Sequence, residues 1–364
     1  MPHGKRTEQS EQHPTHKPKK NSLFSNSTMY LLFIFGIAAI LTAILWSAAN
    51  DILALNKKDH SAVITISETD NFNSVVKQLK KNHIIHYKGY FHIFSVLSKA
   101  KDKVVPGTYE LDTDMDYRAI INNLGPRSSS RMTTLVTIPE GFTVKQVFAE
   151  LADKGVSTVD KLEDMAATHD YAFSFLDDIP MGDPYRLEGY LFPDTYEFYM
   201  GEDPLYVLNK MLLNFDLRVP DDLRKKMEDT GYSVHDIITI ASMIEKESDG
   251  LDRGKISSVI RNRLKKPTSE SAGYLNVDAT LQYVLPEGRL VTQADYETLD
   301  SPYNSYKHKG LPPGPIANPG LEAIQAAITP ENTSYYYYAL DTDGHHQFFK
   351  TFSEHKAFLN KNKK

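Results

Sequence analysis

The longest apolar stretch of the chain lies near its N-terminus. Between Met29 and Ala49 the sequence MYLLFIFGIAAILTAILWSAA carries no charged residue. At about 1.5 Å of rise per residue, these 21 residues (49 − 29 + 1) form a helix of roughly 31 Å, close to the ~30 Å hydrocarbon layer of a bilayer. The pattern therefore predicts one transmembrane helix over residues 29–49.

A cleaved signal peptide is the alternative interpretation of this stretch. The apolar core of a signal peptide is usually shorter, and this run follows 28 mostly polar residues, so an uncleaved anchor fits better. Segment 1–28 carries an excess of basic residues, which favours the cytoplasmic side and places the rest of the chain outside the cell membrane. The charged residues of this tail are Lys5, Arg6, Lys17, Lys19 and Lys20 against Glu8 and Glu11.

Beyond the membrane helix, two segments each begin with the hydrophobic spacing of a strand and continue with that of a helix. Segments Ala62–Leu79 and Thr134–Leu151 both begin with β-branched apolar residues and continue, after a turn, as a helix capped by Asn71 or Thr143. A shift of 72 residues aligns the two segments. We interpret them as related strand-turn-helix units, although short β-α pieces often look alike without duplication.

The first unit continues with further elements that together predict a small α+β module. A strand, two helices and a second strand within about 50 residues are typical of such a module. A Pro-Ser-Arg-rich stretch after it is predicted to be a linker. The expected pieces are helices over 87–97 and 117–124, a strand over 108–111, the module over 50–125, the linker over 126–132 and a main domain over 133–364.

A strongly apolar helix is predicted to begin after Ser233. Asp236 stands three residues later, as in a capping box, and the following residues are apolar on nearly every side. Such a helix is buried in a domain core, because it is too short to cross a membrane. Its last turn reads Glu245-Lys246-Glu247.

This last turn is the main candidate for chemistry. Burial raises the pKa of a carboxyl group, because it disfavours the charged form, and a protonated carboxyl group can act as a general acid. The alternative is that the turn is solvated, with Lys246 keeping its neighbours ionised. Spacing alone does not choose between Glu245 and Glu247.

Three further segments combine loop formers with polar or aromatic residues. RLEGYLFPDTYEF over 186–198 is typical of a loop and strand lining a cleft, although it also fits a solvated turn with core tyrosines. SPYNSY over 301–306 follows Asp278 of LNVDATLQY. GLPPGPIANPG over 310–320 is predicted to be a rigid loop that either builds the wall of a site or only connects two elements.

Composition removes several classes of function. The chain has no cysteine, so it has no disulfide, thiolate nucleophile or iron–sulfur site. A net charge of −6 argues against nucleic-acid binding by the outer part, and the scattered charges of the basic tail need no nucleic acid either. No GxSxG, HExxH or Walker motif occurs, and His345, His346 and His355 are interpreted as surface residues rather than a metal site.

Several motifs occur in a fixed order between Ile138 and His355, with VVPGTYEL upstream. The motifs are IPEG, RLEGYLFPDTYEF, IASMIEKES, Asn262-Arg263-Leu264, LNVDATLQY, SPYNSY, GLPPGPIANPG and YYYYALDTDGHHQFFKTFSEH. Together they resemble one family, the endolytic murein transglycosylases of the MltG (YceG-like) type. A polar insertion over 265–274 departs from the family pattern.

The resemblance implies an α+β protein with a LysM-like domain before a YceG-like catalytic domain. It implies a lyase that cleaves the bond between N-acetylmuramic acid and N-acetylglucosamine in peptidoglycan, leaves 1,6-anhydro ends and needs no metal or cofactor. In this family the catalytic glutamate is the first of the EKE-like motif, which falls on Glu245, and Glu247 becomes secondary.

The expected substrate contacts come from acids, amides and aromatic rings. We expect Glu188 or Asp278 to stabilise positive charge at the sugar, and tyrosines to stack on sugar faces, although most tyrosines of the chain are packing residues. The candidate substrate-binding residues are Glu188, Tyr190, Asp278, Tyr303, Asn304 and Asn318, with Tyr196 and Tyr306 as further stacking candidates.

Two other functions compete with the lyase. One is a non-catalytic peptidoglycan-binding scaffold of the cell-wall synthesis machinery, and the other is a glycosidase that uses water and leaves reducing ends. The expected partners are glycan strands, membrane lipid through residues 29–49, and cell-wall synthases or elongation and division proteins.

Overall fold

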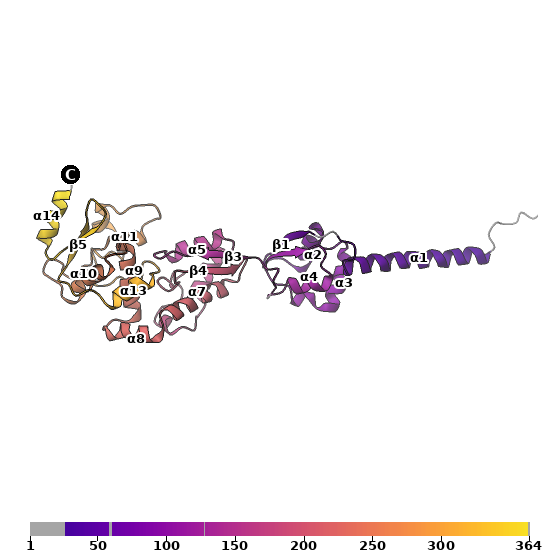
Figure 1. Ribbon diagram of the computed structural model, residues 1–364, viewed down its shortest axis with the longest axis horizontal. Coiled ribbons are helices and arrows are strands. Elements are labelled where there is room, and N and C mark those ends of the chain that lie inside the picture. The colour runs from indigo at the N-terminus through magenta and orange to yellow at the C-terminus, as the bar shows by residue number, and fades with distance from the viewer. Residues whose placement is uncertain (1–25, 58–59, 127, 363–364) are drawn as a thin grey trace, which may run out of the picture.

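The computed structural model describes residues 26–57, 60–126 and 128–362. Most of the predicted basic tail, residues 1–25, lies outside the described residues. Helix α1 (Asn26–Ile52) includes the whole predicted span 29–49 and is about 40 Å long. Within the described residues it is the one helix long and apolar enough to cross a membrane, and its most apolar window is not buried. Figure 1 shows α1 standing clear of the rest of the chain.

A small module follows α1 directly. Strand β1 (Ser61–Ile66) pairs antiparallel with β2 (Gly107–Asp112), in the register Ile66 opposite Gly107. Helices connect and follow these strands, so the predicted order of strand, two helices and strand is confirmed. They are α2 (Phe72–Lys81), α3 (Lys88–Ser98), the 3₁₀ turn η1 (Ala100–Asp102) and α4 (Tyr117–Asn123).

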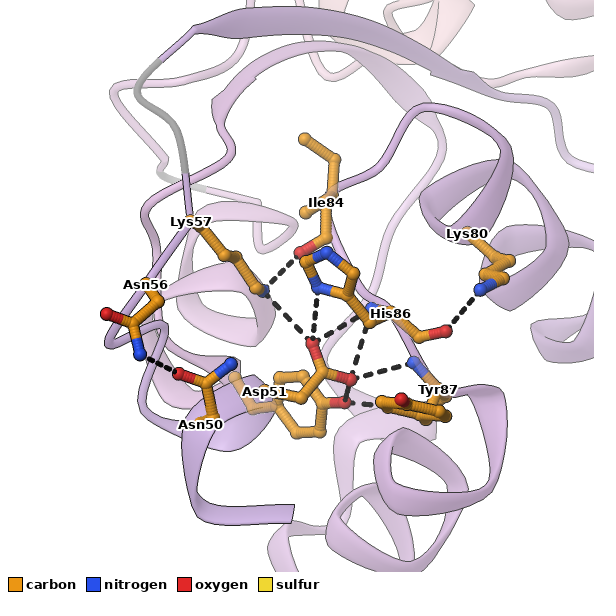
Figure 2. A network of polar contacts seen from close by, with 9 residues as sticks. Asn50, Asp51, Asn56, Lys57, Lys80, Ile84, His86 and Tyr87 are labelled. Atoms are coloured by element: carbon orange, nitrogen blue, oxygen red, sulfur yellow. Dashed lines mark hydrogen bonds and ion pairs between the residues drawn. The ribbon is translucent and has the colours of Figure 1, made fainter. Parts of the chain in front are cut away.

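The end of α1 is joined to this module by a buried carboxylate, Asp51 (Figure 2). Asp51 accepts hydrogen bonds from the backbone N–H groups of His86 and Tyr87, at 2.9 and 2.7 Å. Its side chain also pairs with the Lys57 ammonium at 3.4 Å and accepts a bond from the Tyr117 hydroxyl. A buried charge with this many partners holds its surroundings in one arrangement, because losing any partner leaves the charge uncompensated.

The remaining chain begins with a second two-stranded antiparallel sheet. Strand β3 (Thr133–Thr137) pairs with β4 (Thr195–Tyr199), which places Thr133 opposite Tyr199. Strands β5 (Tyr337–Leu340) and β6 (His346–Phe349) form a third pair near the end. The helices are α5 (Val144–Asp153), α6 (Val159–Thr168), η2 (Ser174–Leu176), α7 (Pro204–Arg218), α8 (Asp221–Asp229), α9 (Val234–Glu247), α10 (Arg253–Lys265), α11 (Asp278–Val284), α12 (Gln293–Thr298), α13 (Leu321–Ile328) and α14 (Phe352–Asn362).

Two separate hydrophobic cores match this division of the chain. One is formed by buried residues between 64 and 124, and the other by buried residues between 136 and 327. The predicted linker 126–132 falls between them, although residue 127 is not described, and the exact domain limits stay a prediction. The two parts touch where the Thr108 N–H donates to the Met200 carbonyl at 3.3 Å, and Arg131 of the linker pairs with Glu202 at 3.3 Å. The mixture of helices and small sheets agrees with the predicted α+β class.

Helix α9 forms the centre of the larger part. The predicted capping box is confirmed: Asp236 N–H donates to the Ser233 hydroxyl and Ser233 N–H donates to the Asp236 carboxylate, both at 3.0 Å. Every residue from Ile237 to Ile244 is buried, as the apolar pattern predicts. Helices α10 and α13 pack against α9. The burial of α9 ends at its last turn, which carries the candidate chemistry.

Candidate active site

Glu245 lies at the point where α9 leaves the core. Its side chain is only 9% exposed, and its Oε2 accepts a hydrogen bond of 3.0 Å from the backbone N–H of Gly320. The neighbouring Lys246 is exposed. The last turn of α9 is therefore not a plain solvated turn, because the carboxylate of Glu245 is enclosed by other parts of the chain.

Arg253, the first residue of α10, gathers three carboxylates around the end of α9. Its Nη2 lies 3.8 Å from Glu245 and 4.0 Å from Glu140, while its Nη1 lies 2.6 Å from Glu322. We call these four residues the Arg253 cluster. With three carboxylates and one guanidinium the cluster has an excess of negative charge. The buried Nε of Arg253 has no hydrogen-bond partner in the described part of the chain.

Glu140 is the carboxylate most directly influenced by Glu245. Burial and then the nearby charge of Glu245 raise the pKa of Glu140, while Arg253 acts in the opposite direction. A Cβ atom at Gly320 would lie 1.9 Å from Oε1 of Glu140, so any larger residue there would force the Glu140 side chain to move. Because residue 320 has no side chain, the carboxylates of Glu140 and Glu245 both lie next to its backbone.

A second buried carboxylate, Glu188, lies behind the Arg253 cluster. Both of its oxygens accept the backbone N–H of Val144 at 3.1 Å, and Oε1 also accepts from Asn318 Nδ2 at 3.2 Å. Burial raises the pKa of Glu188 to about 8, although the hydrogen bonds from Val144 and Tyr283 oppose this rise. Glu188 therefore carries its proton at neutral pH.

Asn318 joins the two loops that deliver Glu140 and Gly320. Its Nδ2 donates to the Phe142 carbonyl at 2.9 Å, and its Oδ1 accepts from Leu191 N–H at 2.9 Å. Its backbone carbonyl accepts from Gly141 N–H at 2.9 Å. We call Glu188, Asn318 and their partners Val144 and Tyr283 the Glu188 clamp. The clamp holds in place the loops that surround Glu245.

Glu247, two residues after Glu245, is held on another side of α9. Its Oε2 accepts the Tyr338 hydroxyl at 2.9 Å and its Oε1 accepts Ala279 N–H at 3.4 Å. Burial raises the pKa of Glu247. It touches neither Arg253 nor Gly320 in any described hydrogen bond or ion pair. The two acids that sequence spacing could not separate therefore occupy distinct environments.

Three of the predicted substrate contacts are fully buried: Asn318, described above, and Tyr190 and Asn304. The Tyr190 hydroxyl lies 2.9 Å from His235 Nδ1. The Asn304 amide donates to the backbone carbonyls of Leu299, at 2.9 Å, and Tyr296, at 3.2 Å. Both side chains have their polar groups satisfied within the fold, so their positions favour a packing role over direct contact with a sugar.

Asp278 and Tyr303 lie nearer to solvent. Asp278 is exposed at the start of α11 and accepts the Tyr306 hydroxyl, and Tyr306 stacks on Tyr296 with ring centroids 4.2 Å apart. Tyr303 is half-buried against Tyr283. These residues keep accessible surface, and their contact with substrate stays a prediction. Tyr196, in contrast, is buried in the core.

The histidines near the C-terminus are only partly as predicted. His345 is 63% exposed, but the His346 side chain is 6% exposed and its Nδ1 lies 2.6 Å from Asp252. The interpretation of His346 as a surface residue is therefore wrong. The packing of β6 beside the start of α10 encloses it, which the local sequence does not reveal.

Sequence reasoning missed three residues of the Arg253 cluster and the glycine that accommodates them. Glu140 lies in the IPEG motif, but it was not selected as a site residue. Arg253 and Glu322 start two different helices far apart in the chain. One signal for Glu140 was available, because a Pro-Glu-Gly triplet after a strand forms a tight turn that projects its acid.

Fold and site together define a class: a mixed α+β enzyme with an apolar N-terminal helix and an enclosed acid at the end of its central helix. The chain belongs to the YceG-like family, whose profile matches residues 64–361. It is 33% identical over 303 residues to the endolytic murein transglycosylase of Bacillus subtilis (strain 168), covering 80% of this chain and 82% of that protein.

Two further comparisons agree with this assignment. The endolytic murein transglycosylase of Streptococcus pneumoniae (strain D39) is 27% identical over 305 residues; the match covers 77% of this chain but only 54% of that longer protein. The crystal structure of a yceG-like protein from Listeria monocytogenes is similar with a TM-score of 0.53 and 27% identity, over 82% of this chain and 99% of that one. The predicted family is therefore confirmed.

Proposed function

We propose that this chain is a membrane-anchored endolytic peptidoglycan transglycosylase with Glu245 as its general acid and base. The enzyme class follows from the family and from relatives named endolytic murein transglycosylase. The observation that carries the role of Glu245 is its position: an enclosed carboxylate at the end of a buried helix, bonded to Gly320 N–H and beside Arg253.

The proposed reaction needs one carboxyl group that gives and takes back a proton. Glu245 donates its proton to the oxygen between N-acetylmuramic acid and N-acetylglucosamine as the bond from that oxygen to the anomeric carbon breaks. The 6-hydroxyl oxygen of the muramic residue then bonds to the anomeric carbon, and its proton passes to the Glu245 carboxylate. The product is a 1,6-anhydro end, and no water is consumed.

The neighbours of Glu245 suit these two proton transfers. Gly320 N–H fixes one carboxylate oxygen and leaves the other on the side of Arg253. Arg253 lies where it balances negative charge after the proton has left. The excess of acids in the cluster also suits a positively charged sugar in the transition state, because it supplies negative potential near the anomeric carbon.

The anchor and the module extend this proposal to the cell envelope. Helix α1 crosses the cell membrane once, with residues 1–28 in the cytoplasm and the catalytic part outside. The βααβ module is the LysM-like domain and contacts glycan strands, while Asp278 and Tyr303 contact substrate near the site. An active site tethered to the membrane meets nascent strands, so cell-wall synthases or elongation and division proteins are the fitting partners.

The decisive experiment is the chemistry of the released ends. Full-length protein in lipid nanodiscs is incubated with purified peptidoglycan, beside its Glu245→Gln variant, and the products are read by mass spectrometry. Glu228→Gln, an exposed acid near the end of α8, is the matched control. We expect anhydro-muramic ends from the parent and from Glu228→Gln, and none from Glu245→Gln.

Each other outcome points to a different function. Reducing ends would mean a glycosidase that uses water and a second carboxylate. Binding of glycan without cleavage by the folded parent would favour the scaffold. Equal cleavage by the parent and by Glu245→Gln would remove Glu245 from the mechanism.

A further inference from the structure

Helix α3 of the small module has apolar residues on the face turned away from the core. Ile93, Val96 and Leu97 are 65%, 72% and 80% exposed, and their spacing places them on one side of the helix. Phe91 and Ser95 on the opposite side are buried. A helix on a water-facing surface normally carries polar residues on its outer side, and an exposed apolar stripe marks a place that binds something.

The position of α3 indicates what covers this stripe. Asp51 accepts the backbone N–H groups of His86 and Tyr87, immediately before α3, so the start of α3 is fixed to the end of α1 (Figure 2). The uncharged run of α1 ends at Ala49, two residues before Asp51. At about 1.5 Å per residue, this joint lies only ~3 Å beyond the apolar span.

Helix α3 lies at the end of the module that adjoins the apolar span. Figure 1 shows α3 at this end, with α2, α4 and β1 farther along the long axis. Phe91 and Ser95 are buried in the module, so the exposed stripe faces away from its core. Helix α3 is about 16 Å long and the interfacial zone is roughly 5–8 Å thick on each side of a bilayer, so docking requires α3 to lie along the bilayer surface.

The charges around α3 also fit a lipid surface. Residues 80–101 contain five lysines and no acid, in a protein whose net charge is −6. Lys88 and Lys99 stand at the two ends of α3, and both are exposed. An amphipathic helix with apolar residues on one side and lysines at its flanks lies in the interface, and lysines near the surface are attracted to anionic lipid headgroups.

We propose that α3 is a membrane-docking helix: Ile93, Val96 and Leu97 insert into the headgroup region of the leaflet from which α1 emerges, and Lys88 and Lys99 contact anionic lipid headgroups. The proposal depends on the membrane anchor proposed above. Docking holds the module against the bilayer at two places, α1 and α3, so that the tilt of the module relative to the bilayer surface is restricted.

The absence of cysteine allows a direct test with single labels. A fluorophore sensitive to polarity is attached to Leu97→Cys in the full chain, reconstituted into vesicles of phosphatidylcholine with phosphatidylglycerol and a spin-labelled quencher lipid. Val63→Cys on β1, an exposed apolar position of the same module, is the matched control, and Ile40→Cys in α1 reports insertion of the anchor. We expect quenching at Leu97 to exceed that at Val63 several-fold, and to fall in Lys88→Gln/Lys99→Gln.

The other results separate the docking proposal from the anchor. Equal weak quenching at Leu97 and Val63, with strong quenching at Ile40, would overturn docking and leave the anchor intact. Weak quenching at all three positions would overturn both. A signal at Leu97 that depends on protein density and not on quencher lipid would assign the stripe to a second copy of the chain and overturn docking to lipid.

Discussion

The Arg253 cluster and the Glu188 clamp use the same two loops for opposite purposes. In the clamp, one buried carboxyl group is surrounded by donors from Val144 and Asn318, and every described polar atom of Asn318 is bonded. In the cluster, three carboxylates share one guanidinium, and one of its nitrogens has no partner. The difference teaches that burial alone does not distinguish a candidate catalytic acid from a structural one. Under the proposed mechanism the reactive acid is Glu245, whose partner Arg253 is shared with two other carboxylates.

The most severe test removes the acid of the cluster. Glu245→Gln keeps an oxygen for Gly320 N–H, so we expect its thermal stability to match that of the parent. Loss of general acid and base catalysis lowers the cleavage rate by about 10²–10⁴-fold. The rate is measured as anhydro ends released per minute, with melting followed by circular dichroism. If a folded Glu188→Gln protein lost cleavage rate to the same extent, the distinction between a reactive Glu245 and a structural Glu188 would be wrong.

The buried Glu188 of the clamp should make the free energy of unfolding depend on pH. The pKa of Glu188 is raised to about 8 in the folded protein from an ordinary value of 4.5, so its stabilising contribution is complete below pH 4.5 and is lost as the pH rises to about 8. At 1.36 kcal/mol per unit the whole loss is about 5 kcal/mol, of which about 4 kcal/mol falls between pH 5 and pH 9. We expect Glu188→Gln, which cannot ionise, to lack this decline. The free energy of unfolding is measured with denaturant at pH 5 and pH 9. An equal decrease in the parent and in Glu188→Gln would contradict the raised pKa of Glu188.

Removing the amide of the clamp should weaken both regions. Asn318→Ala leaves the Leu191 N–H without a partner and removes one of the donors to Glu188, which costs roughly 3 kcal/mol of unfolding free energy. Because the loops carrying Glu140 and Gly320 then keep only their backbone hydrogen bonds, we expect the cleavage rate to fall as well. Tyr338→Phe is the matched control, since it removes a donor from buried Glu247 on another side of α9. It should lower stability by about 1 kcal/mol and leave the rate nearly unchanged. A similar loss of rate in Tyr338→Phe would show that any destabilisation disturbs the site.

The smallest expected effect comes from Glu140. Glu140→Gln removes one negative charge beside Glu245 while keeping the side-chain shape. We expect kcat/KM to fall by up to about tenfold, because the positively charged sugar of the transition state loses one nearby negative charge. Glu322→Gln, on the exposed side of Arg253, is the control and should change kcat/KM less. An unchanged kcat/KM in Glu140→Gln would remove Glu140 from the site.

Local patterns were sufficient to predict the elements but not the partners of the catalytic turn. The strands, the capped helices and the burial of α9 follow from periodicity and capping residues, which act over a few positions. Glu245 and Glu247 are both acids on the last turn of one helix, so periodicity treats them alike. They differ only because Gly320 and Arg253 approach one, and Tyr338 the other, from distant parts of the chain.

The same limit explains why the sequence did not predict the burial of two aromatic and amide residues. Tyr190 and Asn304 lie in segments whose composition is typical of a binding loop, yet each is buried by contacts with residues in other elements, such as His235 and Leu299. No sequence pattern near Arg253 marks it as a site residue, because its carboxylate partners come from three other segments of the chain. The family resemblance, and not the spacing, selected Glu245 before its contacts were known.

The close approach of Gly320 to Glu140 has a consequence for substitutions at either position. Because a Cβ atom at residue 320 would overlap the carboxylate of residue 140, any larger residue at position 320 displaces that carboxylate. A homologue that carries alanine or serine at position 320 therefore has either a shorter residue at position 140 or a glutamate in another rotamer. The conformation at one position thus depends on the residue at the other, 180 positions away in the chain.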